Sequence, residues 1–549
     1  MIGGTPMLKP ITQQQREKIA RYISEMTWQD KLSQVQCIMG SFRTTEEIKE
    51  AAAKWKVGSV FIGNQTKERF REIADAAKDA DVPVIICADL VHGAGSRMFG
   101  ATEFPHYLAC AATDVEDSMK QMGEITAQEG RAYGVHWTFG PVVDLCLEKN
   151  NPMMHVRTAG DDTQRVRRMS KAFVEAVQKE GLMAATAKHF PGDGADERDT
   201  HITTLINGLS REEWEQSYGL IWREMIDSGV MAIMGGHIAL PFIDPQYEEE
   251  ALRYKGPRPA TLSKAIQLDF LRGELGFDGL IVSDALNMVG FGAHIRREEY
   301  GWRLLEAGSD MLLWTDPVQD TPLMLEAMAN GKLTEERVND AVRRVLELKA
   351  RVGLLDGEEA FPGLPEETLA KNKDIAQRVA DRSITIVRDV FSSLPMKGLK
   401  PGAKVLTVTA QYEEGYRNKR DEKDLVFIDE ELRKRGFQVD HLLNPGEGKL
   451  SDQMKEQYDA IFINIKYTPR YGSVRLYGES FHMFKGSWWV ENPKVVFTSF
   501  GDPYKLYDLP SLHNYINVYS NCEVSQRAAV KVWLGEIEAA GKSPVNLDN

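Results

Sequence analysis

The chain has 549 residues, more than one hydrophobic core usually accommodates, so we expect two or more domains. Its formal net charge of −14 argues against a nucleic-acid-binding surface, which would need an excess of positive charge. No uninterrupted apolar run reaches membrane-spanning length, which argues against a membrane protein. Five cysteines without C-x-x-C spacing, and an N-terminus without a basic segment followed by an apolar core, predict a cytoplasmic protein.

Short apolar runs with β-branched residues recur in the first part of the chain, each followed by a helical pattern. They cover residues 35–39, 57–62, 83–89, 136–144, 183–189, 231–237, 280–284 and 309–314, with helical patterns at 115–133, 163–180, 211–228 and 264–275. Eight such alternations predict a (β/α)8 TIM-type barrel. A doubly wound sheet is the alternative, but no Gly-x-Gly-x-x-Gly fingerprint follows the first run.

A second α/β pattern follows the barrel region. The helical stretch 334–355 ends at a segment rich in Pro, Gly and charge, and apolar runs resume at 383–388, 404–409, 460–464 and 494–500. We therefore expect a barrel over residues 1–355, a linker over 356–375 and an α/β/α sandwich domain over 376–549.

Polar residues end five of the runs in the first region. They are Asp89, Asp144, Lys188 with His189, His237 and Asp284. A single acidic strand end is usually a helix cap or a turn residue. Five polar strand ends together favour an active site, because the carboxyl ends of barrel strands converge on one face.

Asp199 and His201 lie two residues apart in the polar loop after the run 183–189. On an extended backbone their side chains project to the same side. The carboxylate can then hold the imidazole in one tautomer and stabilise its cation. Taken alone, the pair also fits an ordinary solvated loop.

Asp284 follows a predicted buried strand and can act as a nucleophile if nearby cations keep it ionised. Lys188, Arg97 and Arg157 can hold the hydroxyls of a polyol. Retaining glycoside cleavage needs a carboxylate nucleophile and a proton donor, and His201 can be that donor. Because no zinc, EF-hand or phosphate-loop spacing occurs, we expect neither a metal nor a cofactor.

These motifs resemble glycoside hydrolase family 3, in its β-N-acetylglucosaminidase branch. Residues 188–194 read K-H-F-P-G-D-G against the family's K-H-F-P-G-H-G, and residues 199–201 read D-T-H against its D-S-H. Further similar segments are 139–144, 151–157, 259–263, 275–279, 283–288 and 307–312, and 499–504 in the second domain. The resemblance implies that Asp284 is the nucleophile, His201 the acid/base and Asp199 its partner. It also implies that the sugar is bound by Asp89, Arg97, Arg157, Lys188 and His189, with His237 beside them.

Three departures bear on which sugar is bound. Asp193 stands where the branch usually has histidine, residues 89–93 read D-L-V-H-G in place of D-Q-E-G-G, and residues 157–160 read R-T-A-G in place of R-S-F-G. The second change is closer to the β-glucosidase branch. In that branch the acid/base is a glutamate of the second domain, for which Glu479 is the candidate here.

The predicted function is a retaining exo-acting glycoside hydrolase that releases β-linked N-acetylglucosamine through a covalent glycosyl-Asp intermediate. The expected partner is a small sugar, such as a muropeptide or chitin fragment, with no nucleic acid or membrane. A phosphorylase or β-glucosidase of the same family is the alternative, because an imidazole, unlike a carboxylate, does not repel phosphate. A sugar-binding scaffold homologue is the non-enzymatic alternative. The oligomeric state is left open.

Overall fold

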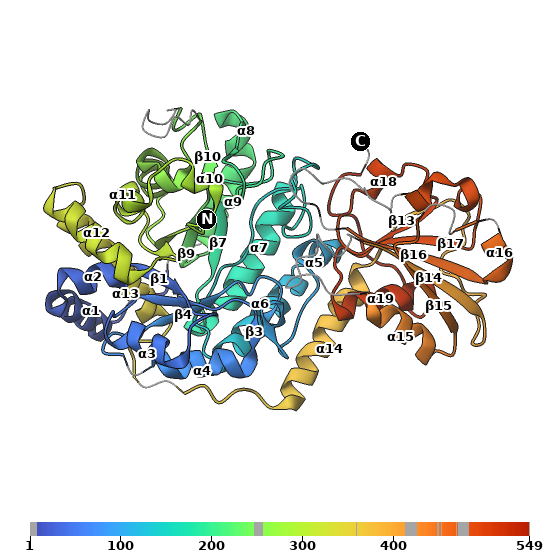
Figure 1. Cartoon of the computed structure of the whole chain (residues 1–549), viewed down its shortest axis with the longest axis horizontal. Helices are drawn as coiled ribbons and strands as arrows, with labels where there is room; N and C mark the ends of the chain where they lie inside the picture. Colours follow the sequence, from blue (N-terminus) through green and yellow to red (C-terminus); the bar gives the residue numbers. More distant parts are fainter. Residues whose placement is uncertain are drawn as a thin grey trace, which may run out of the picture. The chain divides into compact units, whose positions relative to one another are not determined.

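A computed structural model of the chain describes residues 8–78, 80–245, 256–357, 360–411, 425–446, 450–451, 453–467, 469 and 482–547. It divides into two compact units of α/β structure, whose elements are labelled in Figure 1. The first unit contains Met1–Thr102, Lys120–Glu148 and Val166–Leu369, and the second contains Glu103–Met119, Lys149–Arg165 and Ala370–Asn549. Two segments from the first half of the sequence therefore group with the C-terminal part.

The first unit is built on eight short strands. They are β1 (Gln36–Met39), β2 (Ser59–Phe61), β4 (Ile85–Ala88), β6 (Trp137–Thr138), β7 (Thr186–Phe190), β9 (Ala232–Gly235), β11 (Leu280–Ser283) and β12 (Leu312–Leu313). Each coincides with one of the eight apolar runs, with β7 reaching one residue beyond its run, so the strand predictions are confirmed.

All pairings among these eight strands are parallel. One sheet has the order β12-β1-β2-β4-β6 and another the order β11-β9-β7. Single parallel bridges, Trp137↔Ala184 and Val282↔Met311, connect the ends of the two sheets. Side chains from both sheets meet in one buried cluster that includes Phe61, Trp137 and Val282. Two short parallel strand pairs connect loops outside the eight strands. They are β3 (Gln65–Thr66) with β5 (Met98–Phe99), and β8 (Leu205–Ile206) with β10 (Ile238–Ala239).

Helices connect the strands. In chain order they are α1 (Gln13–Glu25), α2 (Trp28–Gln34), α3 (Thr45–Ala53), α4 (Lys67–Ala77), α6 (Asp117–Ala132), α7 (Thr163–Val177), α8 (Arg211–Gln216), α9 (Tyr218–Asp227), η5 (Ala265–Glu274), α10 (Val289–Gly292), α11 (Tyr300–Ala307), α12 (Pro317–Ala329) and α13 (Glu335–Arg351). Capping boxes at Thr12, Thr27, Thr44 and Ser210 start four of them. The predicted helix 211–228 is two helices, because Ser217 leaves the helical region and bonds back to the Glu213 carbonyl.

The second unit is built on a six-stranded sheet of order β13-β18-β17-β16-β14-β15. Its strands are β13 (Thr385–Asp389), β14 (Lys404–Gln411), β15 (Gln438–Leu443), β16 (Ala460–Lys466), β17 (Val495–Ser499) and β18 (Asn514–Asn517), parallel except for β13 against β18. Its helices are α5 (Tyr107–Ala112), α15 (Val426–Lys434), α16 (Gln453–Gln457), α18 (Lys505–Asp508) and α19 (Glu523–Trp533), and α14 (Glu366–Ser383) enters it from the first unit.

Alternate side chains of this sheet enter two different cores. Phe462 packs in a cluster with Leu432 of α15 and Trp533 of α19, whereas Ile461 and Ile463 pack in a second cluster. This alternation is what a strand covered on both faces produces. Each of the four predicted apolar runs overlaps a strand, so those predictions are confirmed.

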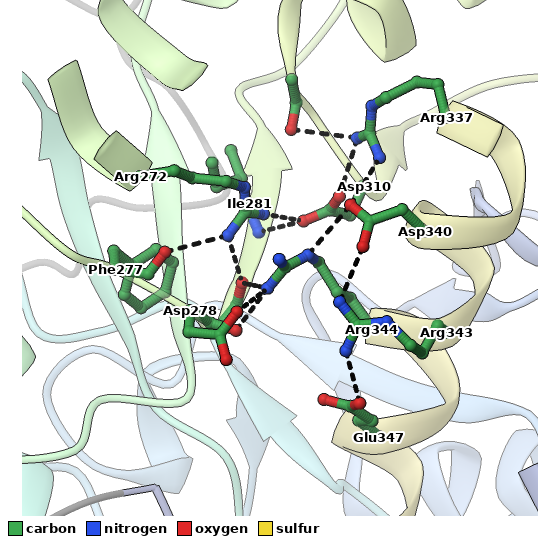
Figure 2. A network of polar contacts seen from close by, with 12 residues as sticks. Arg272, Phe277, Asp278, Ile281, Asp310, Arg337, Asp340, Arg343, Arg344 and Glu347 are labelled. Carbon is green, nitrogen blue, oxygen red and sulfur yellow. Dashed lines mark hydrogen bonds and ion pairs between the residues drawn. The ribbon is translucent and has the colours of Figure 1, made fainter. Parts of the chain in front are cut away.

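A network of ion pairs holds α13 against the amino ends of β11 and β12 (Figure 2). Asp310, which is fully buried, accepts hydrogen bonds from Arg272 at 2.5 Å, from Arg337 at 2.7 Å and from the Ile281 N–H at 2.8 Å. Three donors satisfy this buried carboxylate, and the motif at 307–312 therefore has a structural role. Within the described residues, no helix is long and apolar enough to cross a membrane.

Candidate active site

The predicted site residues of the first unit lie at the carboxyl ends of its strands. Asp89 directly follows β4 and Asp284 directly follows β11, while Lys188 and His189 lie near the end of β7. His237 comes two residues after β9. The ion-pair network around Asp310 lies before β12, at the amino ends. Charged side chains therefore occupy both ends of the strands, in separate groups.

Lys188 and Asp89 form a close ion pair. The Lys188 Nζ lies 2.8 Å from the Asp89 Oδ1, and the lysine is 4% exposed. Because a buried ammonium needs a compensating anion, each side chain holds the other in place. β4 and β7 thus contribute an opposite-charge pair to the same site.

Asp144 is the anchor for His189. This carboxylate is fully buried and accepts the His189 Nδ1–H at 2.8 Å and the His189 backbone N–H at 3.1 Å. It also accepts the Asp193 N–H at 2.7 Å. Because Nδ1 donates to Asp144, the proton-bearing nitrogen and the orientation of the ring are fixed. Asp144 was predicted to end a strand but was not among the expected site residues. Its position at a strand end is the sequence signal that could have identified it.

Asp193 belongs to a tightly held turn. Its side chain accepts the Gly194 N–H at 2.5 Å, and its carbonyl accepts the Tyr218 hydroxyl at 2.5 Å. The preceding Gly192 has φ 132°, and a Cβ there would lie 2.3 Å from the Tyr218 ring. Only glycine fits both the backbone conformation and the close contact. The carboxylate of Asp193, which is 3% exposed, thus stabilises the turn after His189.

Asp284 is held ionised. Its Oδ1 accepts the Ala285 N–H at 2.7 Å. Burial raises the pKa of Asp284, but interactions with His237 and His189 outweigh this effect. The Ala285 N–H and Lys188 act in the same direction, so the pKa of Asp284 lies below its ordinary value. A carboxylate nucleophile needs this charge state.

His237 supports the Asp284 segment. Its Nε2 donates to the Ala285 carbonyl at 2.9 Å, its Nδ1 lies 3.0 Å from the Thr261 hydroxyl, and its ring stacks on Phe291. Burial lowers the pKa of His237, and the interaction with Asp284 acts in the opposite direction. Both nitrogens have protein partners and the side chain is fully buried. The predicted role of His237 in sugar binding stays a prediction, and the bonds that its ring makes here are to protein groups.

Asp199 and His201 form the expected dyad. The His201 Nδ1 lies 2.7 Å from the Asp199 Oδ1, which also accepts the His201 backbone N–H at 2.9 Å. The side chain of His201 is 55% exposed and that of Asp199 is 13% exposed. Because Asp199 occupies Nδ1, Nε2 is the nitrogen that can exchange a proton with a ligand.

The two predicted arginines lie in different units. Arg97 donates to the Asn64 Oδ1 at 3.2 Å, in a loop that the buried Glu129 anchors by accepting the Thr102 N–H and hydroxyl, both at 2.7 Å. Arg157 belongs to the second unit, so its place at the site stays a prediction. Glu479 lies outside the described residues.

A cavity of about 560 Å³ adjoins the segment that follows Asp284. It is lined by the segment 286–288, by residues of α10, and by Arg297, Tyr300 and Trp314 further along the chain. Aromatic rings and polar groups are combined in its wall, as in many small-molecule sites. Among the described residues, no group of three or more His, Cys, Asp or Glu side chains is arranged to hold a metal ion.

The sequence matches the N-terminal domain of glycosyl hydrolase family 3 over residues 27–348. A β-N-acetylglucosaminidase/β-glucosidase of Cellulomonas fimi is 32% identical over 541 residues, which cover 95% of this chain and 94% of that protein. The chain belongs to glycosyl hydrolase family 3. The resemblance inferred from the motifs is thereby confirmed.

Two solved structures share the fold of both units. A β-glucoside phosphorylase bound to 2FGlc has a TM-score of 0.86 at 29% identity, with 99% of this chain and 98% of that chain covered. A family 3 β-N-acetylglucosaminidase from Paenibacillus sp. str. FPU-7 has a TM-score of 0.81 at 24% identity, with 95% and 99% covered. This family 3 chain is therefore a glycosidase-type enzyme of two α/β units.

Proposed function

We propose that this chain is a retaining, exo-acting β-N-acetylglucosaminidase. The observation that carries the proposal is the pairing of a half-buried Asp284, whose pKa is lowered, with a formed Asp199–His201 dyad in one unit. The relationship to the Cellulomonas fimi enzyme supports the sugar. The proposed nucleophile is Asp284, the acid/base is His201, and Asp199 orients its imidazole.

In the first step Asp284 attacks the anomeric carbon, and the bond from that carbon to the leaving oxygen breaks. The His201 imidazolium gives its Nε2 proton to that oxygen, so a neutral alcohol departs and a glycosyl ester forms on Asp284. In the second step neutral His201 takes a proton from water as the water oxygen attacks the same carbon. Asp284 leaves as a carboxylate, and two inversions give retention.

A slow-turnover fluorinated N-acetylglucosaminyl or glucosyl donor tests the nucleophile. Mass spectrometry of the digested protein should find the sugar on the peptide that contains Asp284. A label on any other peptide would refute the assignment. Sugar binding without turnover on a full panel of aryl β-glycosides would instead indicate a scaffold homologue.

Substitution His201→Ala tests the proton donor. General acid catalysis contributes about 10²–10⁴-fold, and poor leaving groups depend on it most. We expect a loss of that order for an alkyl or sugar leaving group and only a small loss for a dinitrophenyl group. Equal losses on both substrates would contradict the acid role.

We propose that the sugar is bound by Asp89, Lys188, His189, Arg97 and Arg157, with His237 supporting Asp284. The leaving group must lie between Asp284 and His201. We therefore expect it in the cavity beside Asn287. Trp314→Ala should raise KM for a disaccharide by about tenfold, since a lost stacking contact costs about 1–1.5 kcal/mol. An unchanged KM for the disaccharide would place the leaving group elsewhere.

Phosphorolysis is the second candidate function. It is favoured by the likeness to the β-glucoside phosphorylase and by an imidazole base that does not repel phosphate anions. In this variant a phosphate oxygen, in place of water, attacks the glycosyl ester, which yields a sugar 1-phosphate. Product analysis in concentrated phosphate decides between them, and the absence of sugar 1-phosphate would exclude the variant. The same assay with β-glucosides tests the glucosidase alternative.

We further propose that the eight parallel strands form a closed (β/α)8 barrel, supported by the bridges between the two sheets. The proposed domain limits are 1–355 for the barrel, 356–375 for the linker and 376–549 for an α/β/α sandwich. Free, buried cysteines support a cytoplasmic location, because thiols persist in reducing compartments. A muropeptide or chitin fragment is the proposed substrate, and turnover of chitobiose against a muropeptide would distinguish them.

A further inference from the structure

The dyad loop, defined as residues 199–204, is bonded to the first turn of α10. The first backbone N–H groups of a helix lack partners within the helix and need acceptors from elsewhere. In α10 no side chain caps them. The Val289 N–H donates to the His201 carbonyl at 3.1 Å, and the Gly290 N–H donates to the Thr200 carbonyl at 3.1 Å. The loop that carries the proposed acid/base therefore caps this helix.

A second set of contacts holds the far end of the dyad loop. The Thr204 hydroxyl donates to the Gly290 carbonyl at 2.9 Å, and its oxygen lies 2.6 Å from the His294 Nε2. Since the hydroxyl proton goes to Gly290, His294 is the donor to Thr204. Thr204 is 3% exposed and His294 is 4% exposed. These buried contacts hold Thr204 against α10, so the loop is fixed at both ends.

The close approach depends on the absence of a side chain at Gly290. A Cβ at this position would lie 2.5 Å from the Thr200 carbonyl oxygen and 2.7 Å from the Thr203 carbonyl oxygen. Both atoms belong to the backbone of the dyad loop and cannot rotate away. Any larger residue must therefore push the loop off α10.

We propose that α10 holds the acid/base dyad in position, with Gly290, Thr204 and His294 as positioning residues. The proposal rests on the proposed acid/base role of His201. α10 begins five residues after Asp284, so one short stretch of chain carries the nucleophile and sets the position of the proton donor. Binding of the dyad loop to α10 thus sets the position of His201 relative to Asp284.

The substitution Gly290→Ala tests this proposal. We expect kcat/KM for a glycoside with a poor leaving group to fall by about 30-fold or more, as proton transfer is lost. For a dinitrophenyl glycoside it should change by less than about threefold, because Asp284 is retained. Gly273→Ala, on η5, is the matched control, since its Cβ would meet only the Leu268 carbonyl at 3.4 Å. It should change neither rate.

Thr204→Val is the milder second variant and decides the question if Gly290→Ala does not fold. It removes the hydroxyl that joins Gly290 to His294, and we expect a loss of about fivefold, again selective for the poor leaving group. A loss of equal size on both substrates, or no loss in either variant, would overturn the proposal.

His201→Ala in the same assay separates the two levels of inference. If His201→Ala shows the selective loss and the positioning variants do not, the proposal that α10 positions the dyad is wrong, while the acid role of His201 stands. If it shows no selective loss, the acid role itself fails. Amide hydrogen exchange then tests the docking alone: the Val289 amide should exchange slowly in the wild type and faster in Gly290→Ala, and equal exchange rates would refute the docking.

Discussion

Replacing Asp144 by asparagine should damage both stability and activity. In the wild type this buried carboxylate accepts the ring N–H and backbone N–H of His189 and the N–H of Asp193. Asparagine has one acceptor oxygen, and its amide hydrogens face at least one of the three donors. The variant therefore keeps the shape of the site but removes an acceptor at a fully buried position.

The size of the effect follows from the contacts. A hydrogen bond to a charged group contributes about 1.5–3 kcal/mol, and an unsatisfied buried donor costs about 1–3 kcal/mol. We expect Asp144→Asn to lower the free energy of unfolding of the first unit by about 3–5 kcal/mol. A His189 ring displaced by about 1 Å should lower kcat/KM by about 10²-fold. Activated and poor leaving groups should suffer equally, because Asp284 and His201 are untouched.

Urea unfolding and kcat/KM on two glycosides test this prediction. Asp278→Asn is the control, because that side chain is 75% exposed and its ion pair with Arg344 lies at the other end of the strands. Because solvent screens the exposed carboxylate of Asp278, we expect this pair to contribute about 0–1 kcal/mol. The reasoning is refuted if Asp144→Asn unfolds within about 1 kcal/mol of the wild type and keeps its activity within about threefold.

Three further predictions concern buried charge. Burial lowers the pKa of Lys349 from 10.5 to about 7, so between these values only the unfolded chain binds the proton and stability rises with pH. At pH 7, Lys349→Met should remove a penalty of about 4 kcal/mol, while the lost bond to Gln34 costs about 1–2 kcal/mol. Urea unfolding should therefore find the variant more stable than the wild type at pH 7, and this difference in free energy of unfolding should be about 3 kcal/mol smaller at pH 9.5. Lys264→Met, at an exposed position, should show no such pH dependence. Asp310→Asn should cost the first unit about 3–5 kcal/mol without changing KM, and a changed KM in the folded variant would contradict its structural role. Asp502→Asn should cost the second unit a similar amount, and an effect confined to the first unit would contradict that placement.

The strands were predictable because each is a short, continuous apolar run between polar turns. β15 was missed for the opposite reason: it is an edge strand whose side chains are mostly exposed, so no apolar run marks it. β18 was missed because asparagine stands at both of its ends. The break at Ser217 depends on a hydroxyl that bonds back to the helix, which periodicity does not report.

The candidate site was predictable only as far as its signals are local. Asp199 and His201 are two residues apart, so spacing alone predicts the dyad that the structure contains. The bond from Val289 to His201 joins residues far apart in the sequence, and no pattern around either of them predicts it. For the same reason, the sequence did not indicate that residues 149–165, with Arg157, group with the second unit.

That grouping has a physical basis in the second unit. His155, two residues before Arg157, lies 3.2 Å from Asp502, and Lys505 lies 2.5 Å from the same carboxylate. Burial raises the pKa of Asp502, but Lys505 and His155 outweigh this effect and hold the pKa well below its ordinary value. A carboxylate that stays charged in a buried position must keep the partners that stabilise its charge. The loop that carries Arg157 is therefore tied to the Asp502 segment, and the conformation of a proposed sugar-binding residue depends on the second unit. Loss of Asp502 should then raise KM for every substrate that Arg157 contacts, whereas loss of Asp310 should not.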